Sequence, residues 1–309
     1  MTGRLAWPRL RPGDVVRLVS PASFPDPAGV AATVGVLESW GLRVQVGRHA
    51  HARWGYLAGR DPERLADLDD AFRDREVRAI VTTRGGAGAY RICEELDFDA
   101  VRADPKPLVG FSDITYLHAT LWRECGLPAL HGCLVGGEAI RSARALLMDG
   151  ATLAVPSDDT AYSARIRFPG VVSGPLVGGH LSALSHLVGA GLPDLSGAIL
   201  LLEDKRDMGL GRVDRQLTQL RRAGVLDSVA GVALGLFTGF DDYTDRGWAL
   251  VDVLADHLGR LGVPVLGGLR IGHHGTDRTG APDQSCVVVG GDAVLDADGG
   301  TLTTVSAAV

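Results

Sequence analysis

The stretch PKPLVGFSDITYLHATLW, residues 105–122, contains a change from one hydrophobic period to another. The apolar run at 107–111 is typical of a short buried strand, and apolar residues recur at helical spacing from Ile114 onward. The change falls at Ser112, so a strand is expected to pass directly into a helix there. Strands and helices that alternate in this way predict a parallel sheet covered by helices.

The same alternation extends outward from this stretch to residue 14. Strand-like runs occupy 14–23, 42–50, 77–86 and 107–111, and helical segments are expected at Pro27–Trp40, Pro62–Arg73 and Tyr90–Leu96. Connections of this length imply right-handed crossovers. The sequence therefore predicts an α/β fold whose N-terminal domain, residues 1–140, is a doubly wound parallel sheet.

The rest of the chain changes character. Residues 141–170 are polar and short-stranded, which suits a linker. Residues 171–309 alternate apolar strands with helices expected at Val213–Ala223 and Trp248–Leu261, and end in a strand-rich segment. A second domain, smaller, mixed and β-rich, is predicted there.

Composition excludes several classes of function. The 309 residues carry a net charge of -6 and contain no dense Lys/Arg run, which argues against a nucleic-acid partner. No apolar run matches a signal peptide or a membrane span, so a cytoplasmic protein without a membrane partner is expected. The four cysteines show no C-x-x-C pairing, and no metal site or cofactor is predicted.

Ser112 has two interpretations. A serine before a polar first turn is a common helix N-cap. A serine at a sharp strand-to-helix turn is also the nucleophile elbow of acyl-transfer enzymes, although the G-x-S-x-G form is only half met, since Gly110 is present without a second glycine. On this stretch alone, the N-cap is the favoured interpretation.

A glycine-rich loop follows the third predicted strand. TTRGGAGAYRI, residues 82–92, places Gly85, Gly86 and Gly88 before a helix, where bare backbone N–H groups favour a negative ligand. It fails as a dinucleotide fingerprint because Arg91 stands where the last glycine would be. A tight turn is the plainer interpretation, but the carboxyl ends of neighbouring strands share a crevice, so the loop is expected beside Ser112.

A nucleophilic serine needs a base and a carboxylate. Among the nine histidines, His118 and His131 are expected to be satisfied structural residues, whereas His273 and His274 lie in a Gly-rich loop of the kind that carries catalytic groups. Glu203, at the end of an apolar strand, is the candidate carboxylate. For an isolated Glu-Asp pair, however, a solvated turn is the better interpretation.

Taken together, the segments resemble one family. The chain is similar to the S66 serine peptidases, the LD-carboxypeptidases (muramoyltetrapeptide carboxypeptidases) and the related microcin C self-immunity hydrolases. The similar segments, in the family's order, are RPGDVVRLVSPAS, GYLAGRDPERLADLDDAFRDREVRAIVTTRGGAGAYRI, PLVGFSDITYLH, LHGCLVG, GPLVGGHLSAL, ILLLEDK, VDRQLTQLRRAGVL and IGHHGTDRT.

The resemblance implies a Ser-His-Glu triad and a hydrolase without a cofactor. Ser112 would be the nucleophile, His273 the base and Glu203 the group that orients it, with backbone N–H groups of Gly86 and Asp113 as the oxyanion hole. Matching the family's G-x-x-x-G-H pattern to this loop selects His273, so His274 would be a solvent or supporting residue. The implied substrate is a murein tetrapeptide that loses its terminal D-alanine, and a homodimer is expected.

The chain departs from the family's usual residues around the expected crevice. Ala87 replaces a tyrosine, Cys133 a proline and His180 an asparagine; with Arg84 and Gly85 they are the candidate substrate-binding residues. These departures leave the triad intact and bear on the choice of substrate. The alternatives are a microcin-type hydrolase of acyl or peptidyl nucleotide conjugates and a non-catalytic peptide-binding homologue.

Overall fold

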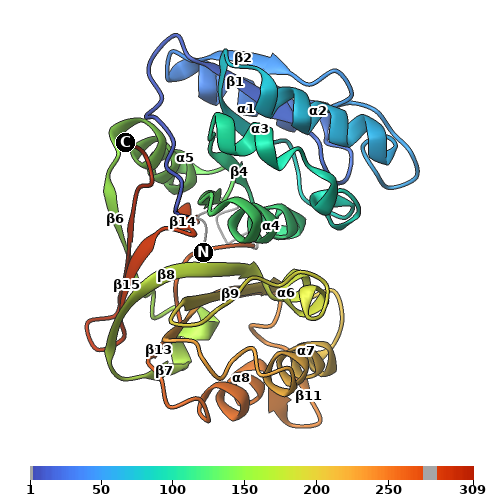
Figure 1. The fold of residues 1–309 in the computed structure, drawn as a ribbon. Helices are drawn as coiled ribbons and strands as arrows, with labels where there is room; N and C mark the ends of the chain where they lie inside the picture. Colours follow the sequence, from blue (N-terminus) through green and yellow to red (C-terminus); the bar gives the residue numbers. More distant parts are fainter. Residues whose placement is uncertain (1–2, 274–283) are drawn as a thin grey trace.

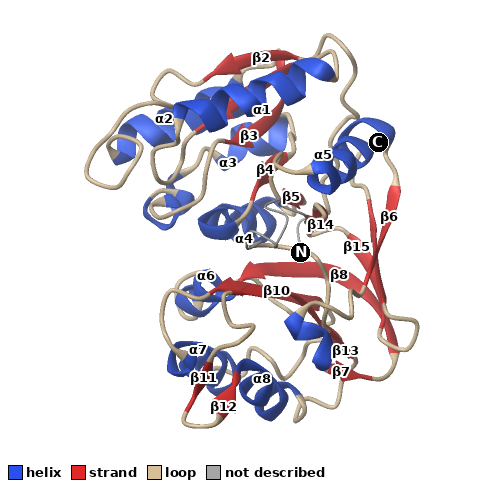
Figure 2. Ribbon diagram, turned by 180° about the vertical axis from the view of Figure 1, so that it is seen from behind, coloured by secondary structure: helices blue, strands red, loops and turns tan. Residues whose placement is uncertain are grey.

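The described residues form two large sheets, each with its own helices, and one two-stranded hairpin (Figures 1 and 2). The computed structural model describes residues 3–273 and 284–309. Within these residues no helix has the length and apolar character needed to cross a membrane.

The first sheet is parallel apart from one edge strand. Its order is β2 (Arg43–Val46), β1 (Val15–Val19), β3 (Val77–Thr82), β4 (Leu108–Gly110), β5 (Ala129–His131) and β14 (Val287–Val289), and only β14 is antiparallel to its neighbour. Its helices are α1 (Pro27–Ser39), α2 (Asp61–Arg73), α3 (Phe98–Ala103), α4 (Thr115–Cys125) and α5 (Gly137–Arg144). The predicted α/β class, with a parallel N-terminal sheet and a mixed C-terminal one, is confirmed.

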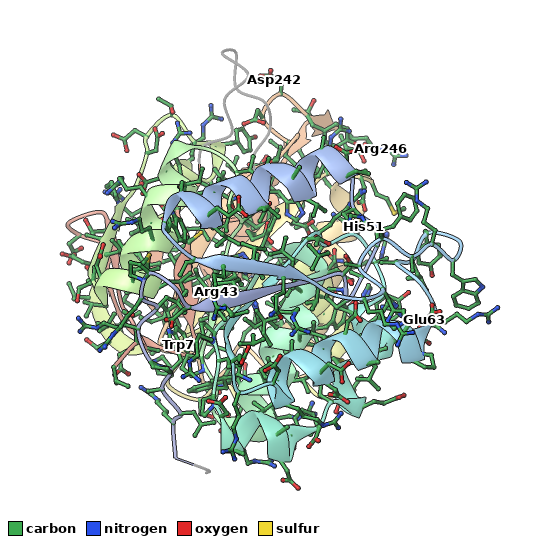
Figure 3. All side chains as sticks on the ribbon, turned by 90° about the horizontal axis from the view of Figure 1, so that it is seen from above. Trp7, Arg43, His51, Glu63, Asp242 and Arg246 are labelled. Carbon is green, nitrogen blue, oxygen red and sulfur yellow. The ribbon has the colours of Figure 1, made fainter. Side chains whose placement is uncertain are left out.

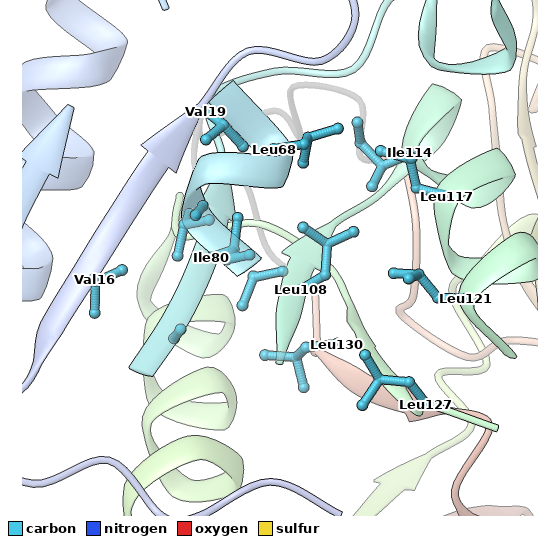
Figure 4. Packing of buried hydrophobic residues seen from close by; sticks show 14 of the residues in the cluster. Val16, Val19, Leu68, Ile80, Leu108, Ile114, Leu117, Leu121, Leu127 and Leu130 are labelled. Atoms are coloured by element: carbon cyan, nitrogen blue, oxygen red, sulfur yellow. The ribbon is translucent and has the colours of Figure 1, made fainter. Parts of the chain in front are cut away.

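Helices α2, α3 and α4 pack against one another in turn along the first sheet. Seen from above, α1 and α2 lie on opposite sides of the first strands of the sheet, with Glu63 near the first turn of α2 (Figure 3). Between sheet and helices, Leu108 and Leu130 from the strands face Leu117 and Leu121 from α4, all fully buried (Figure 4). Burial of each such side chain stabilises the folded state by about 1.5–3 kcal/mol. These contacts hold α4, and therefore its first turn, against β4.

The second sheet is mixed. Its order is β6 (Thr152–Pro156), β16 (Thr301–Val305), β15 (Asp292–Asp296), β8 (Val171–His180), β9 (Ile199–Lys205), β10 (Gly231–Thr238), β13 (Val265–Leu266) and β7 (Arg167–Phe168). Helices α6 (Leu181–Leu187), α7 (Leu210–Arg222) and α8 (Leu250–Leu258) accompany it, and β11 (Thr244–Asp245) pairs with β12 (Trp248–Ala249) in a small hairpin. The central part of this sheet is parallel, and it consists of the adjacent strands β8, β9, β10 and β13.

Each of the two large sheets includes strands from outside the residue range expected for its domain. The segment 141–170, expected as a linker, supplies β6 and β7 to the two edges of the second sheet. Strand β14 returns to the first sheet, where Val288 pairs with Leu130. The expected helix at Tyr90–Leu96 consists of two 3-10 turns, Ala89–Arg91 and Cys93–Glu95.

The carboxyl ends of the strands from both sheets meet in one region. In the first sheet Gly110 pairs with His131 at the ends of β4 and β5, and in the second His180 pairs with Glu203 at the ends of β8 and β9. His131 Nε2 lies 3.9 Å from Glu203 Oε1, which joins the two ends. Polar groups that follow these strands are therefore brought together.

Candidate active site

Ser112 occupies a sharp turn between β4 and α4. Its φ is 64°, in the left-handed region that residues with a side chain rarely adopt, and a 3-10 turn over Ser112–Ile114 leads into α4. A side chain at Gly110 would overlap Thr82 and Ile114, and a Cβ at Gly85 would lie 2.9 Å from Ser112 Cβ. The two glycines thus make room for the turn.

His273 connects Ser112 to Glu203. Its Nε2 lies 3.0 Å from Ser112 Oγ, and its Nδ1 lies 2.6 Å from Glu203 Oε2. The backbone N–H of His273 also donates to Glu203 Oε2 at 3.0 Å, and Thr238 donates its hydroxyl to the His273 carbonyl. The imidazole is therefore fixed at both its backbone and its ring, with Nε2 directed at the serine.

Glu203 is fully buried at the end of β9 and stays ionised. Burial opposes its charge, but the charge and hydrogen bond of His273, with the nearby His180, lower the pKa of Glu203 to about 2. Gly272 has a φ of +96°, and a side chain there would overlap that of Glu203. The solvated-turn interpretation of the Glu-Asp pair is wrong, because Asp204 is fully buried as well.

The glycine loop is held from three sides. Ser23 accepts a hydrogen bond from the Ala87 N–H at 3.1 Å, and Asp113 Oδ2 accepts one from the Ala89 N–H at 2.7 Å. The buried Arg64 donates to the carbonyl of Gly88 at 2.9 Å and also to that of Pro21.

The backbone N–H groups of Gly86 and Asp113 remain open. Neither is hydrogen-bonded to another residue in the described part of the chain. An N–H group without a protein partner, held on a fixed loop or turn, is available to a ligand oxygen. The side chain of Asp113 faces inward, and burial, only partly offset by the Ala89 N–H, raises its pKa to about 6.

His131 and His118 are both buried without a hydrogen bond to either ring nitrogen among the described residues, so the expectation of satisfied structural histidines holds for neither. The position of His131 bears on the site. Burial lowers its pKa to about 4, which keeps the ring neutral at physiological pH. Its ring packs against His118 at 6.2 Å and Phe111 at 6.3 Å between centroids. His131 therefore forms an uncharged wall behind Glu203.

A second pair of an imidazole and a carboxylate lies beside the first. His180 Nε2 is 3.1 Å from Asp204 Oδ1, and Arg212 Nη2 donates to the same oxygen at 2.8 Å. The rings of His180 and His273 have centroids 5.2 Å apart. The residue that departs from the family's asparagine is thus in contact with the candidate base.

A pocket of about 600 Å³ opens beside these groups. Gly86, Ala87, Asp113 and His180 line it, and its other wall is formed by α6 and α7 with Arg212 and Arg215 among its residues. The volume is in the range of ligand sites. It can accept a short peptide.

Three of the candidate substrate-binding residues do not line this pocket. Gly85 packs against Ser112, Arg84 is exposed with Nη1 3.5 Å from the carbonyl of Phe24, and Cys133 accepts a hydrogen bond from Gln284 Nε2 at 2.7 Å. His274 lies outside the described residues. Within the described ranges no group of three or more His, Cys, Asp or Glu side chains could hold a metal ion.

Sequence reasoning missed Arg64, Ser23 and Asp204. Asp204 adjoins Glu203, and the alternation of side chains along a strand is a signal that it must face a different partner. Arg64 sits in an acidic helical stretch, where an arginine is ordinarily a surface residue. Nothing in the sequence indicated its burial under the glycine loop.

Comparison with known families assigns the chain. The model described as the LD-carboxypeptidase N-terminal domain of peptidase family S66 matches residues 16–132, and the model of the C-terminal domain matches residues 173–287. The chain belongs to the S66 LD-carboxypeptidase family. It is therefore a member of a family of serine hydrolases.

Individual relatives cover almost the whole chain. A putative carboxypeptidase of Streptomyces coelicolor is 39% identical over 304 residues, 96% of this chain and 94% of the relative. The murein tetrapeptide carboxypeptidase of Pseudomonas aeruginosa is 31% identical over 89% of this chain and 93% of its own length. The crystal structure of an MccF-like protein from Bacillus anthracis superposes with a TM-score of 0.85 at 22% identity, covering 97% of this chain and 99% of that one, which shows the shared fold.

Proposed function

We propose that this S66 family member is a serine LD-carboxypeptidase that hydrolyses the amide bond of the terminal D-alanine in murein tetrapeptides. One observation carries the proposal: His273 links Ser112 Oγ, at 3.0 Å, to the buried Glu203, at 2.6 Å. A hydroxyl, an imidazole and a carboxylate connected in this order form the arrangement that activates a serine nucleophile.

In the first half of the reaction, His273 Nε2 takes the proton of Ser112 as its oxygen attacks the amide carbonyl. Nδ1 must then carry a proton, and Glu203 Oε2 accepts the hydrogen bond from it. Because the pKa of Glu203 is about 2, its carboxylate is charged throughout the working pH range and stabilises the imidazolium that forms. The imidazolium next protonates the leaving nitrogen and releases D-alanine.

The carbonyl oxygen becomes negatively charged in the tetrahedral intermediate. The open N–H groups of Gly86 and Asp113 are suited to receive it, as donors that need no rearrangement. Removal of one such donor costs about 2.7–4 kcal/mol of transition-state stabilisation in other enzymes. Water then attacks the acyl-enzyme, with His273 again acting as the base.

The substrate assignment follows the family and the pocket. The Pseudomonas aeruginosa relative is a murein tetrapeptide carboxypeptidase, and the 600 Å³ pocket beside Gly86 suits a short peptide. The departures at Ala87 and His180 both line this pocket, so they affect what binds and leave the bonds of the triad unchanged.

The test is a comparison of two tetrapeptides that differ only at their last centre. The purified protein is incubated with a murein tetrapeptide ending in D-alanine and with its L-alanine epimer, and release of alanine is followed by mass spectrometry. We expect release from the D form alone. Equal rates, or release from neither, would overturn the substrate assignment.

Two further measurements separate the alternatives. Ser112 should be labelled by a fluorophosphonate, and Ser112→Ala should be neither labelled nor active; an unlabelled wild-type serine would favour a binding homologue. Hydrolysis of an acyl sulfamoyl adenosine, with no release of D-alanine, would favour a conjugate hydrolase using the same residues.

A further inference from the structure

His180 stands at the boundary between the candidate base and the pocket. Its side chain is 18% exposed and lines the pocket, while its Nε2 contacts the fully buried Asp204 at 3.1 Å. The backbone N–H of His180 donates a hydrogen bond to the Thr115 hydroxyl oxygen at 3.1 Å, which fixes the backbone. The other ring nitrogen, Nδ1, has no hydrogen bond to a described residue and is available to a ligand.

The position of the leaving group follows from the chemistry of the proposed function, on which this inference rests. The leaving nitrogen must come within about 3 Å of His273 Nε2 to receive its proton. The carboxylate carbon of a C-terminal residue is two bonds from that nitrogen, about 2.5 Å away. The terminal carboxylate therefore lies beside the His273 ring, against which His180 packs at 5.2 Å between centroids.

Three arginines around the site are less suited. Arg212 already donates to Asp204, Lys205 and Ser182, and pairs with Asp207 at 2.9 Å. Arg84 does not line the pocket, and Arg215 lies on the wall that α7 forms. We propose that His180, held by Asp204, binds the C-terminal carboxylate of the peptide and so makes the enzyme select for a free carboxyl terminus.

Electrostatics support a charged ring at this position. Burial opposes the charge of His180, but the hydrogen bond to Asp204 and the charges of Asp204 and Glu203 raise its pKa above the ordinary value, although Arg212 acts in the other direction. A charged imidazole donates from both nitrogens, one to Asp204 and one to the ligand. The negative charge of Asp204 offsets the repulsion that His180 would otherwise exert on His273 when His273 takes up its proton.

The experiment uses matched substrates and variants. One peptide is the tetrapeptide ending in D-alanine, and the other ends in D-alaninamide, which lacks the charge. For the wild type we expect a higher kcat/KM on the acid. His180→Gln should lower the acid-to-amide ratio of kcat/KM by about 10- to 100-fold, the range of a charge-assisted hydrogen bond. The ratio is measured within each variant, so partial misfolding affects both substrates equally.

A control replaces another histidine that pairs with an acid. His49 Nδ1 lies 2.9 Å from Asp67 Oδ1 and does not line the pocket, so His49→Gln should leave the ratio unchanged. A second readout is the binding of both peptides to the inactive Ser112→Ala variant, measured by calorimetry. Adding His180→Gln to this variant should weaken binding of the peptide that ends in D-alanine and leave binding of the D-alaninamide peptide unchanged.

The outcomes are distinguishable. If the wild type releases neither D-alanine nor D-alaninamide, the proposed function fails and the inference with it. If the wild type prefers the acid and His180→Gln keeps that preference, the inference fails and the function stands. Loss of the preference in Arg215→Gln instead would place the carboxylate on α7 and overturn the role of His180. A fall of the ratio in the His180 variant alone supports it.

Discussion

Replacing Ser112 by glycine should stabilise the protein relative to replacement by alanine. Ser112 has a φ of 64°, and a residue with a Cβ pays about 1–2 kcal/mol for a left-handed conformation, whereas glycine does not. Glycine in turn costs about 0.4–1 kcal/mol through the greater freedom of the unfolded chain. The balance leaves Ser112→Gly more stable than Ser112→Ala by up to about 1.6 kcal/mol, with a midpoint of about 0.8 kcal/mol, while both variants should lose hydrolysis.

The assay is urea unfolding of both variants, followed by circular dichroism. Ser39, in the last turn of the helix Pro27–Ser39, gives the matched control, since glycine there should be less stable than alanine by about 0.5–1 kcal/mol. If Ser112→Gly is also less stable than Ser112→Ala, the backbone of Ser112 is not strained. The nucleophile elbow then does not lower the stability of the protein.

Three other changes test the support of the site. Asp113→Asn removes a carboxyl whose pKa is raised from 3.8 to about 6, so its ionisation lowers the stability of the folded wild type by up to about 3 kcal/mol. In urea unfolding, the variant should therefore become more stable relative to the wild type as the pH rises from 4 to 7. A stability difference that does not change with pH would contradict this. Glu203→Gln should lower kcat in the D-alanine release assay by about 10³- to 10⁴-fold, because the amide no longer stabilises the His273 imidazolium, and a loss below tenfold would refute that role. Gly272→Ala should lower both the activity and the melting temperature, because its φ is +96° and the methyl group would overlap Glu203. The control is Gly262→Ala, with φ +67° and open space around it, which should lower the melting temperature only. Equal activities of the two variants would contradict the overlap with Glu203.

Much of the first domain could be predicted from the sequence, because each of its central strands is a short apolar run between helical patterns. The passage from β4 through Ser112 into α4 is local in sequence, so its period change is visible there. Strand β14 is different. The apolar run Val287–Val289 fits the edge of either sheet, and only the tertiary fold pairs it with β5.

The parts of the candidate site that lie in sequence motifs could be predicted, whereas the part formed by the packing of helices could not. Ser112, Glu203 and His273 follow strands or glycines that the sequence displays, and the structure brings them within hydrogen-bonding distance. The catalytic roles and the homodimer stay predictions. The pocket wall with Arg212 and Arg215 was not foreseen, because a helix face becomes a wall only once α7 has packed against its neighbours.

Adjacent residues of β9 explain how two imidazoles in contact can take different roles. Successive side chains of a strand point to opposite faces, so Glu203 contacts His273 while Asp204 contacts His180 and Arg212. Glu203 Oε1 has no hydrogen-bond partner among the described residues, so its charge acts mainly through His273. Asp204 is shared with Arg212 and Ser182, which fixes His180 in place. In the proposed mechanism, one acid therefore serves proton transfer at Ser112 and its neighbour serves selection of the peptide terminus, and a substitution at position 180 changes the substrate while the triad remains.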